Sequence, residues 1–473
     1  MYKVVIGLEV HCQLNTSSKN FSSSLNSYAS LPNTNVSPVD LGYPGVLPVI
    51  NKEAIKKSLK TALALNCKIP KYLNFDRKNY FYPDLPKGYQ ITQMHNPIGT
   101  DGYLMINVDG VDKKVLIHDT HLEEDTANLN HYGTYSLIDY NRCGVPLLET
   151  VTEPCLYSVK EAICFLETLR NLFIYCDISD ARSDKGQIRC DVNVSLMKEN
   201  DTKLGTRVEM KNINTFNNVK DAIECEVKRQ TEILNSGGVI VQETRRYDDN
   251  LKQTFSMRNK EDAIDYKYFV EPNIPKIKLD DEYILRVKKE IPVLSFDRVN
   301  NYINEYKITR VDANTMVKDI NVANYFEKAV ETGGNPIMLA NWITGIILAH
   351  LNKFNLTIDK ISLEPSVLVE LLKMVEDNKL STKQAREVLN KALEEDKNPL
   401  DLVKSMNVSQ ISDETEILKV INEVLEENPN LVEDYKNGKK VFDYIIGQIM
   451  KKTRGRVNPG ITSKLLREEL EKK

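Results

Sequence analysis

Near the start of the chain stands Val4-Val5-Ile6-Gly7-Leu8-Glu9-Val10-His11-Cys12-Gln13-Leu14, in which apolar and polar side chains alternate. Successive side chains of a β-strand point to opposite faces, so Glu9, His11 and Gln13 would share one face. The stretch therefore predicts a strand with one buried apolar face and one face of ionisable groups. Such a face is also typical of plain solvated sheet surface, because antiparallel sheets often face water on one side.

Two later stretches repeat this alternation. Their polar positions are Arg189, Asp191, Asn193 and Ser195 in the first, and Arg207, Glu209 and Lys211 in the second. Oxygen and nitrogen ligands two residues apart on one strand face suit a hard cation such as Mg²⁺ with a phosphorylated ligand. Because the expected strands do not alternate regularly with helices, we predict an α+β fold with a mixed or antiparallel sheet.

The composition changes near residue 290. All eight cysteines, thirteen of twenty glycines and five of six histidines come before it, and the remainder is typical of short helices. We therefore predict a sheet domain over residues 1–291, an all-helical domain over 292–405 and a small helical tail domain over 406–473. A length of 473 residues is consistent with about three domains.

Helix starts are indicated by capping residues. Asn51 is expected to cap one helix, and Ser158 with Glu161 forms a capping-box pattern before another. A third helix is expected to begin near 217 and to end at 237–238, where two glycines follow each other. Ser381 is the expected start of a helix in the second domain.

The composition also argues against several classes of protein. The net charge is −4, so any RNA contact requires a local basic patch. The apolar stretch 342–351 is shorter than the roughly 20 residues of a membrane span, and no signal peptide is seen. No two cysteines form a Cys-x-x-Cys pair. We expect a reduced, cytoplasmic protein with no membrane contact, whose cysteines are core residues.

Two more groups of ionisable residues are candidates for a site. His118, His121, Glu123, Glu124 and Asp125 lie close together, which is typical of a charged turn and less often of a metal site. Glu149 follows a mostly apolar run. A carboxylate in that position is costly unless it is paired, bound to a metal or exposed at a strand end.

The common nucleotide-binding and hydrolase motifs are missing from the sequence. It has no Gly-x-x-x-x-Gly-Lys-Ser/Thr loop and no Gly-x-Gly-x-x-Gly turn, so any ATP site is built differently. Gly-x-Ser-x-Gly, His-Glu-x-x-His and a serine-rich amidase signature are missing as well. We therefore expect that the chain does not release ammonia from glutamine by itself.

Six further stretches are long and distinctive. They are Ile6-Gly7-Leu8-Glu9-Val10-His11, Tyr43-Pro44-Gly45-Val46-Leu47-Pro48, Arg77-Lys78-Asn79-Tyr80-Phe81-Tyr82-Pro83-Asp84-Leu85-Pro86-Lys87-Gly88-Tyr89-Gln90-Ile91, His121-Leu122-Glu123-Glu124-Asp125, Arg189-Cys190-Asp191-Val192-Asn193 and Glu209-Met210-Lys211-Asn212-Ile213-Asn214. Together they resemble the B-subunit family of the bacterial-type aspartyl/glutamyl-tRNA(Asn/Gln) amidotransferases, and the resemblance covers the whole chain.

This resemblance implies a fold and a function. The family has an N-terminal cradle domain with a kinase site, a helical domain and a tail that contacts tRNA. It converts Glu-tRNA(Gln) to Gln-tRNA(Gln), and often Asp-tRNA(Asn) to Asn-tRNA(Asn). In this family, the B subunit activates the tRNA-borne carboxylate with ATP. It belongs to a heterotrimer in which the amidase (A) subunit hydrolyses glutamine and a small (C) subunit clamps the other two. The expected partners are therefore these two subunits and misacylated tRNA, with no DNA.

The resemblance also implies residue roles. The Mg²⁺ site of the family maps onto His11, Glu124 and Glu149, with Glu9 and Asp191 close by. Lys78 and Lys87 match basic residues near the family's ammonia path and active site. Together with His11 and Glu124 they form the expected catalytic set. The alternative is that both are ordinary surface lysines. Glu124 is expected to guide or deprotonate ammonium, and its replacement by Gln to preserve folding. The expected cofactor contacts are Arg189, Asp191, Arg207, Lys211 and Arg258.

The chain departs from the family at one place. Many members carry four cysteines after the first strand, spaced as for zinc, whereas the matching stretches 21–24 and 36–40 contain serines and no cysteine. Serine is a poor Zn²⁺ ligand beside a thiolate, so we expect no structural zinc.

A basic run in the tail is a candidate tRNA contact. Residues 436–456 include seven basic side chains and a single acidic one, Asp443. A solvated helical face is the alternative. The expected contacts are Lys439, Lys440, Lys451, Lys452, Arg454 and Arg456.

Three functions remain open from the residues alone. The first is an enzyme subunit that activates and amidates aminoacyl-tRNA, and the second is a non-catalytic adaptor that positions tRNA. An adaptor has no need of Glu9, His11, Glu124 and Asp191 in one converging set. The third, a stand-alone metal hydrolase, lacks any hydrolase motif.

Overall fold

The computed structural model describes residues 2–28, 30–213, 215–259, 265–406, 414–436, 439, 441–453, 457 and 459–472. These residues form two compact units, Met1–Asp297 and Arg298–Lys473. Each unit has its own hydrophobic core.

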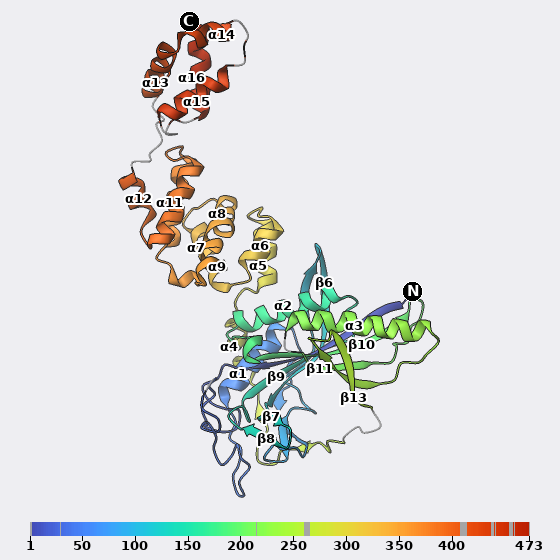
Figure 1. The fold of residues 1–473 in the computed structure, drawn as a ribbon. Helices are drawn as coiled ribbons and strands as arrows, with labels where there is room; N and C mark the ends of the chain where they lie inside the picture. The colour runs from blue at the N-terminus through green and yellow to red at the C-terminus, as the bar shows by residue number, and fades with distance from the viewer. Residues whose placement is uncertain are drawn as a thin grey trace. The chain divides into compact units, whose positions relative to one another are not determined.

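The first unit is built on an eight-stranded sheet (Figure 1). Neighbouring strands are antiparallel except β11 and β12, which are parallel. This mixed sheet confirms the predicted α+β class. In spatial order the strands are β13 (Gln253–Asn259), β12 (Glu243–Asp248), β11 (Val208–Ile213), β10 (Ile188–Lys198), β1 (Tyr2–Gln13), β9 (Pro146–Thr152), β6 (Val111–Glu124) and β5 (Gly99–Val108).

One face of this sheet is apolar and covered by helices. Ile6, Leu8 and Val10 of β1 are at most 1% exposed in the core. The helices are α1 (Lys52–Ala64), α2 (Val159–Tyr175) and α3 (Phe216–Asn235), with α4 (Asp281–Lys289) against α1. Figure 1 shows α2 and α3 lying along one side of the sheet.

The predicted helix starts are confirmed. Asn51 caps α1, and Ser158 accepts a hydrogen bond from the Glu161 amide at the start of α2. The capping box is incomplete, however, because the Glu161 carboxylate accepts from the Tyr157 amide. Thr215, rather than Asn217, caps α3.

Smaller groups of strands lie beside the eight-stranded sheet. β3 (Asp76–Asn79) lies between β4 (Tyr89–Thr92) and β14 (Phe269–Val270), and β4 contacts β6. Two further pairs are β2 (Tyr72–Leu73) with β15 (Ile277–Lys278), and the hairpin β7 (Asn128–Tyr132) with β8 (Tyr135–Asp139). Leu73 of β2 and Ile91 of β4 belong to the hydrophobic core of the first unit.

The second unit is helical and contains two hydrophobic clusters. The first is formed by α5 (Ser295–Asn304), α6 (Arg310–Met316), α7 (Ile320–Glu331), α8 (Pro336–Trp342), α9 (Leu348–Phe354), α10 (Pro365–Glu376), α11 (Thr382–Glu395, capped by Ser381 as predicted) and α12 (Pro399–Met406). The second is formed by α13 (Glu414–Glu427), α14 (Pro429–Lys436), α15 (Phe442–Lys452) and α16 (Pro459–Lys472). The separate second cluster supports the proposal of a tail domain after residue 406. Residues 407–413 lie outside the part of the chain that the structure describes.

One helical segment is longer than its sequence suggested. Residues 336–354 run continuously through α8, a π-helical turn (Ile343–Ile347) and α9. These 19 residues are long and apolar enough to cross a membrane by length and composition, which corrects the shorter stretch expected from the sequence. Leu339, Ile343 and Ile347 of this segment are fully buried in the core of the second unit. The helix therefore packs as a core element.

Candidate active site

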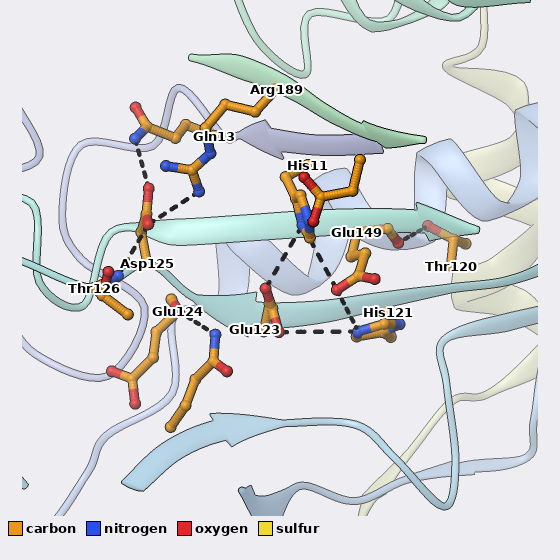
Figure 2. A network of polar contacts seen from close by, with 12 residues as sticks. His11, Gln13, Thr120, His121, Glu123, Glu124, Asp125, Thr126, Glu149 and Arg189 are labelled. Carbon is orange, nitrogen blue, oxygen red and sulfur yellow. Dashed lines mark hydrogen bonds and ion pairs between the residues drawn. The ribbon is translucent and has the colours of Figure 1, made fainter. Parts of the chain in front are cut away.

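Three adjacent strands bring two histidines and a glutamate into line on the polar face. His11 of β1 lies opposite Glu149 of β9, and Glu149 lies opposite His121 of β6. Glu123, two residues after His121 on β6, points to the same side (Figure 2). We call His11, His121, Glu123 and Glu149 the histidine cluster.

The side chains of the histidine cluster lie close together. His11 Nδ1 is 3.6 Å from a Glu149 carboxylate oxygen and 3.9 Å from a Glu123 oxygen. His121 Nε2 is 3.3 Å from Glu149, and His121 Nδ1 is 2.7 Å from Asp119. Two imidazoles and two carboxylates therefore lie side by side, largely buried, on this face of the sheet.

The electrostatics of this cluster are strongly perturbed. Burial alone would lower the pKa of His121, but the Glu149 carboxylate and the hydrogen bond to Asp119 raise it well above its ordinary value. Burial would raise the pKa of Glu149, but the His11 and His121 imidazoles hold it well below its usual range. Burial and the nearby Glu149 raise the pKa of Glu123. Such shifts are typical of functional sites.

The cluster also fits a divalent cation. His11 Nδ1 is buried and has no hydrogen-bond partner among the described residues, although two carboxylates face it. One ligand atom each from His11, Glu123 and Glu149 lies within 4.8 Å of the others. A buried imidazole nitrogen without a partner, beside two carboxylates, is the donor set that a metal ion would complete.

A second group of carboxylates lies further along the same face. Glu9 of β1 is opposite Asp191 of β10, and Glu209 of β11 completes a set whose oxygens lie within 4.8 Å of one another. Lys211 Nζ is 3.1 Å from Asp191 and 3.0 Å from Glu209. Asn193 donates a 2.8 Å hydrogen bond to Glu9. We call Glu9, Asp191 and Glu209 the acidic cluster; His11 Nε2 lies 4.0 Å from Asp191, which links the two clusters.

Glu124 does not lie with His11 and Glu149 in this structure. It neighbours Glu123 on β6 and points away from it (Figure 2). There it pairs with Lys87 and accepts a 2.9 Å hydrogen bond from the Ile91 amide. The resemblance implied a set of His11, Glu124 and Glu149, but neighbouring residues of a strand point to opposite sides, and His121 to Glu124 belong to β6. In this structure Glu123, rather than Glu124, lies beside His11.

The Lys87–Glu124 pair is almost completely buried. Its side chains are 8% and 2% exposed. Burial would lower the pKa of Lys87, but the Glu124 carboxylate raises it above its ordinary value. A small cavity of about 90 Å³ is lined by Lys87, Tyr89 and Ile91 together with residues of the 39–48 loop. A larger cavity of about 680 Å³ lies at the far end of β1 and β10, around Tyr2 and Lys198, away from both clusters.

Lys78 is placed beside the histidine cluster. It lies on β3, and its ammonium is 5.0 Å from the centre of the Tyr266 ring. Burial would lower the pKa of Lys78, but Glu123 and Glu149 raise it. Lys78 is therefore a partly buried lysine whose ammonium is close enough to the two carboxylates to feel their charge.

The remaining expected cofactor residues have different positions. Arg189 is on the polar face and donates a 3.1 Å hydrogen bond to Asp125, which also accepts a hydrogen bond from Gln13. Burial would raise the pKa of Asp125, but the positive charge of Arg189 lowers it to about 2. Arg207 is exposed just before β11, and no hydrogen bond or ion pair in the described part of the chain joins it to either cluster. The side chain of Arg258 lies outside the described residues.

The serines at the expected zinc position bind a buried aspartate. Ser22, Ser24 and Ser37 donate side-chain hydrogen bonds to Asp40. Lys19, which is 0% exposed, lies 3.4 Å from the same carboxylate. Asp40 is thus the common acceptor that joins the two stretches.

This network predicts that the first unit needs no zinc. We expect metal analysis of the purified chain to find far less than one zinc per chain, and a zinc-selective chelator to leave the melting temperature unchanged, because the hydroxyl–carboxylate network occupies the position. One zinc per chain, or a large loss of stability with that chelator, would contradict this prediction.

The tail lysines lie on and before α15. Lys439 is 2.7 Å from Asp434, and Lys452 is 2.6 Å from Glu427. Lys451 is exposed. Exposed ion pairs of this kind contribute only about 0–1 kcal/mol, so they leave these lysines available to a phosphate. Lys440, Arg454 and Arg456 lie outside the described residues.

Removing three tail charges should weaken tRNA binding. For the triple variant Lys439→Ala, Lys451→Ala and Lys452→Ala, we expect the slope of log affinity against log salt to fall by about 2–3 units. Filter binding at several salt concentrations measures this slope. The matched control removes Lys383, Lys391 and Lys397 from the α11 region. An unchanged slope in the tail variant would count against the contact.

The chain belongs to the GatB/GatE family, whose catalytic domain matches residues 4–285. The GatB domain family matches residues 324–470. Curated relatives are named as the B subunit of aspartyl/glutamyl-tRNA(Asn/Gln) amidotransferase. That of Oceanobacillus iheyensis is 44% identical over 471 residues, covering 99% of each chain, and that of Geobacillus kaustophilus is 44% identical over 474 residues, covering all of each chain. That of Persephonella marina is likewise 44% identical over 99% of each chain.

Proposed function

We propose that this chain is the ATP-using subunit that activates and amidates Glu-tRNA(Gln), and Asp-tRNA(Asn) where that substrate exists. The name shared by its relatives supports the reaction. The observation that carries the proposal is the histidine cluster, in which buried His11 Nδ1 faces two carboxylates beside Lys78. A tRNA-binding adaptor has no need of such a cluster.

The activation step requires negative charge to be offset. ATP transfers its terminal phosphoryl group to the carboxylate on the tRNA, so two negatively charged groups must approach each other. His11, Glu123 and Glu149 would hold Mg²⁺, which when bound offsets this charge. Lys78 and Lys211 lie at the two clusters as fixed cations. Arg189, oriented by Asp125, adds a third positive group on the same face.

The amidation step requires ammonia in its neutral form. The Glu124 carboxylate, paired with Lys87 next to the 90 Å³ cavity, can hold an incoming ammonium and accept the proton that converts it to ammonia. Ammonia then displaces phosphate from the acyl phosphate, and the proton that the nitrogen loses in this step leaves with the phosphate. Its burial excludes water, which would otherwise hydrolyse the acyl phosphate.

The proposal includes partners and a compartment. No amidase signature is present in the sequence, so ammonia has to come from a glutaminase partner, which is the family's amidase subunit. The small third subunit completes the proposed heterotrimer. ATP and Mg²⁺ are the proposed cofactors. We place the complex in the cytoplasm, where charged tRNA is made.

Amide formation tests the proposal against the adaptor hypothesis. The amidase and the small partner protein, with and without this chain, are given ATP, Mg²⁺, ammonium chloride and Glu-tRNA(Gln), and Gln-tRNA(Gln) is measured. We expect product only when the chain is present. Product at an equal rate without the chain would overturn the proposal, and tight tRNA binding without product would favour the adaptor.

A further inference from the structure

Four tyrosines form a continuous row beside Lys78. The ring centres of Tyr82 and Tyr80 are 5.8 Å apart with the rings nearly parallel. Tyr80 is 6.2 Å from Tyr266, and Tyr266 is 6.0 Å from Tyr268. We call Tyr80, Tyr82, Tyr266 and Tyr268 the tyrosine row. Its members come from two segments separated by more than 180 residues of sequence.

Backbone contacts hold these two segments together. β3 pairs with β14, so that Arg77 lies opposite Phe269. Asn79 donates its backbone amide to the Tyr266 carbonyl at 3.0 Å, and its side-chain amide to the Tyr266 and Lys267 carbonyls at 3.2 and 2.8 Å. The spacing of the rings is therefore fixed by the fold.

The row begins at the candidate active site. The Lys78 ammonium lies 5.0 Å from the centre of the Tyr266 ring, and the charges of Glu123 and Glu149 in the histidine cluster raise its pKa against the effect of burial. From there the row leads outward to Tyr82, which is 43% exposed, and to its neighbour Phe81, which is 87% exposed. Lys267, between Tyr266 and Tyr268, is exposed as well.

Aromatic rings in a row beside cations suit single-stranded nucleic acid. Unpaired bases stack on tyrosine and phenylalanine rings without regard to sequence, and lysines contact the phosphates between them. A single nucleotide such as ATP offers one base and would use one or two rings. Four rings leading away from the reaction centre match several successive bases.

We propose that the tyrosine row binds the unpaired nucleotides at the 3′ end of tRNA and thereby places the aminoacyl group beside Lys78. This inference rests on the proposed function, because only a charged tRNA brings a carboxylate to that position. The terminal base would lie nearest Tyr266 and Tyr268, and the preceding bases nearest Tyr80 and Tyr82. The row thus positions the substrate and takes no part in proton transfer.

A binding cycle tests this inference without catalysis. The full chain, assembled with the amidase and the small partner protein, is titrated with a tRNA(Gln) transcript ending in CCA and with the same transcript lacking its last three nucleotides. Tyr80→Ala and Tyr82→Ala should each weaken binding of the complete transcript at least about fivefold, the loss of one stacked base. Neither should change binding of the truncated transcript. Tyr82→Phe keeps the ring and should bind like the parent.

Tyr157→Ala is the matched control. Tyr157 is 42% exposed, close to the 43% of Tyr82, and lies between β9 and α2, outside the row. Equal weakening of both transcripts by the row variants would overturn the inference. A raised KM for ATP with unchanged tRNA binding would overturn it as well, and would assign the row to the adenine of ATP. Row-dependent binding of the CCA end without any amide product would support the inference while removing the proposed function.

Discussion

Replacing Glu149 with Gln should reduce amide formation at least about 100-fold while the chain stays folded. Glu149 is the central member of the histidine cluster, 3.6 Å from His11 and 3.3 Å from His121. Gln has nearly the same shape but carries no charge, so it cannot balance the imidazoles and is a weaker ligand for a cation. The initial rate of Gln-tRNA formation measures the effect.

A second readout for this variant does not depend on activity. Mg²⁺ that binds the folded chain should raise its melting temperature, by mass action. We expect this rise in the parent chain and a much smaller one in Glu149→Gln. Glu153→Gln is the matched control, because Glu153 lies just after β9, is 43% exposed and pairs with His118. A Glu149→Gln variant within about threefold of the parent rate would refute the assignment.

Replacing Glu124 with Gln should separate the two half-reactions. Glu124 lies on the side of β6 away from the histidine cluster and faces Lys87, so phosphoryl transfer should persist while amide formation falls at least about 100-fold. ADP and Gln-tRNA, measured in the same reaction, report the two steps. Loss of both to the same extent would place Glu124 in the activation step.

The same variant should also be less stable, which revises the expectation drawn from the sequence. Removing one partner of a buried ion pair leaves the other charge uncompensated, at a cost of about 3–5 kcal/mol. The double variant Glu124→Gln with Lys87→Met removes both charges and should recover much of this stability while remaining inactive. Chemical denaturation measures the stability. A double variant that forms amide would show that the pair is structural only.

Alternation along single strands was enough to predict part of the site. The polar faces of β1 and β10 follow directly from the two-residue period, and the structure confirms that Glu9, His11 and Asp191 share one side of the sheet. Glu123 belonged to the candidate group of residues 118–125, but the resemblance assigned the metal-ligand role to Glu124 instead. Extending the strand to Glu124 would have placed His121 and Glu123 on one face, so the signal was present in the sequence.

Other parts of the site depend on contacts between distant segments. The pairing of Lys87 with Glu124 spans 37 residues, and the register of β9 between β1 and β6 decides that Glu149 meets both histidines. Such registers are fixed by packing of the whole sheet rather than by local sequence. The tyrosine row likewise exists only because β3 pairs with β14.

Formation of ADP by the chain assembled with the amidase and the small partner protein shows whether this chain activates the tRNA-borne carboxylate. The mixture contains ATP, Mg²⁺, ammonia and either Glu-tRNA(Gln) or uncharged tRNA(Gln), with Glu149→Gln as the comparison. We predict that ADP forms with the charged tRNA, at a rate well above that with uncharged tRNA, and that Glu149→Gln abolishes the difference. Tight binding of tRNA with no ADP that depends on its charging would contradict the account and move the chemistry to a partner protein.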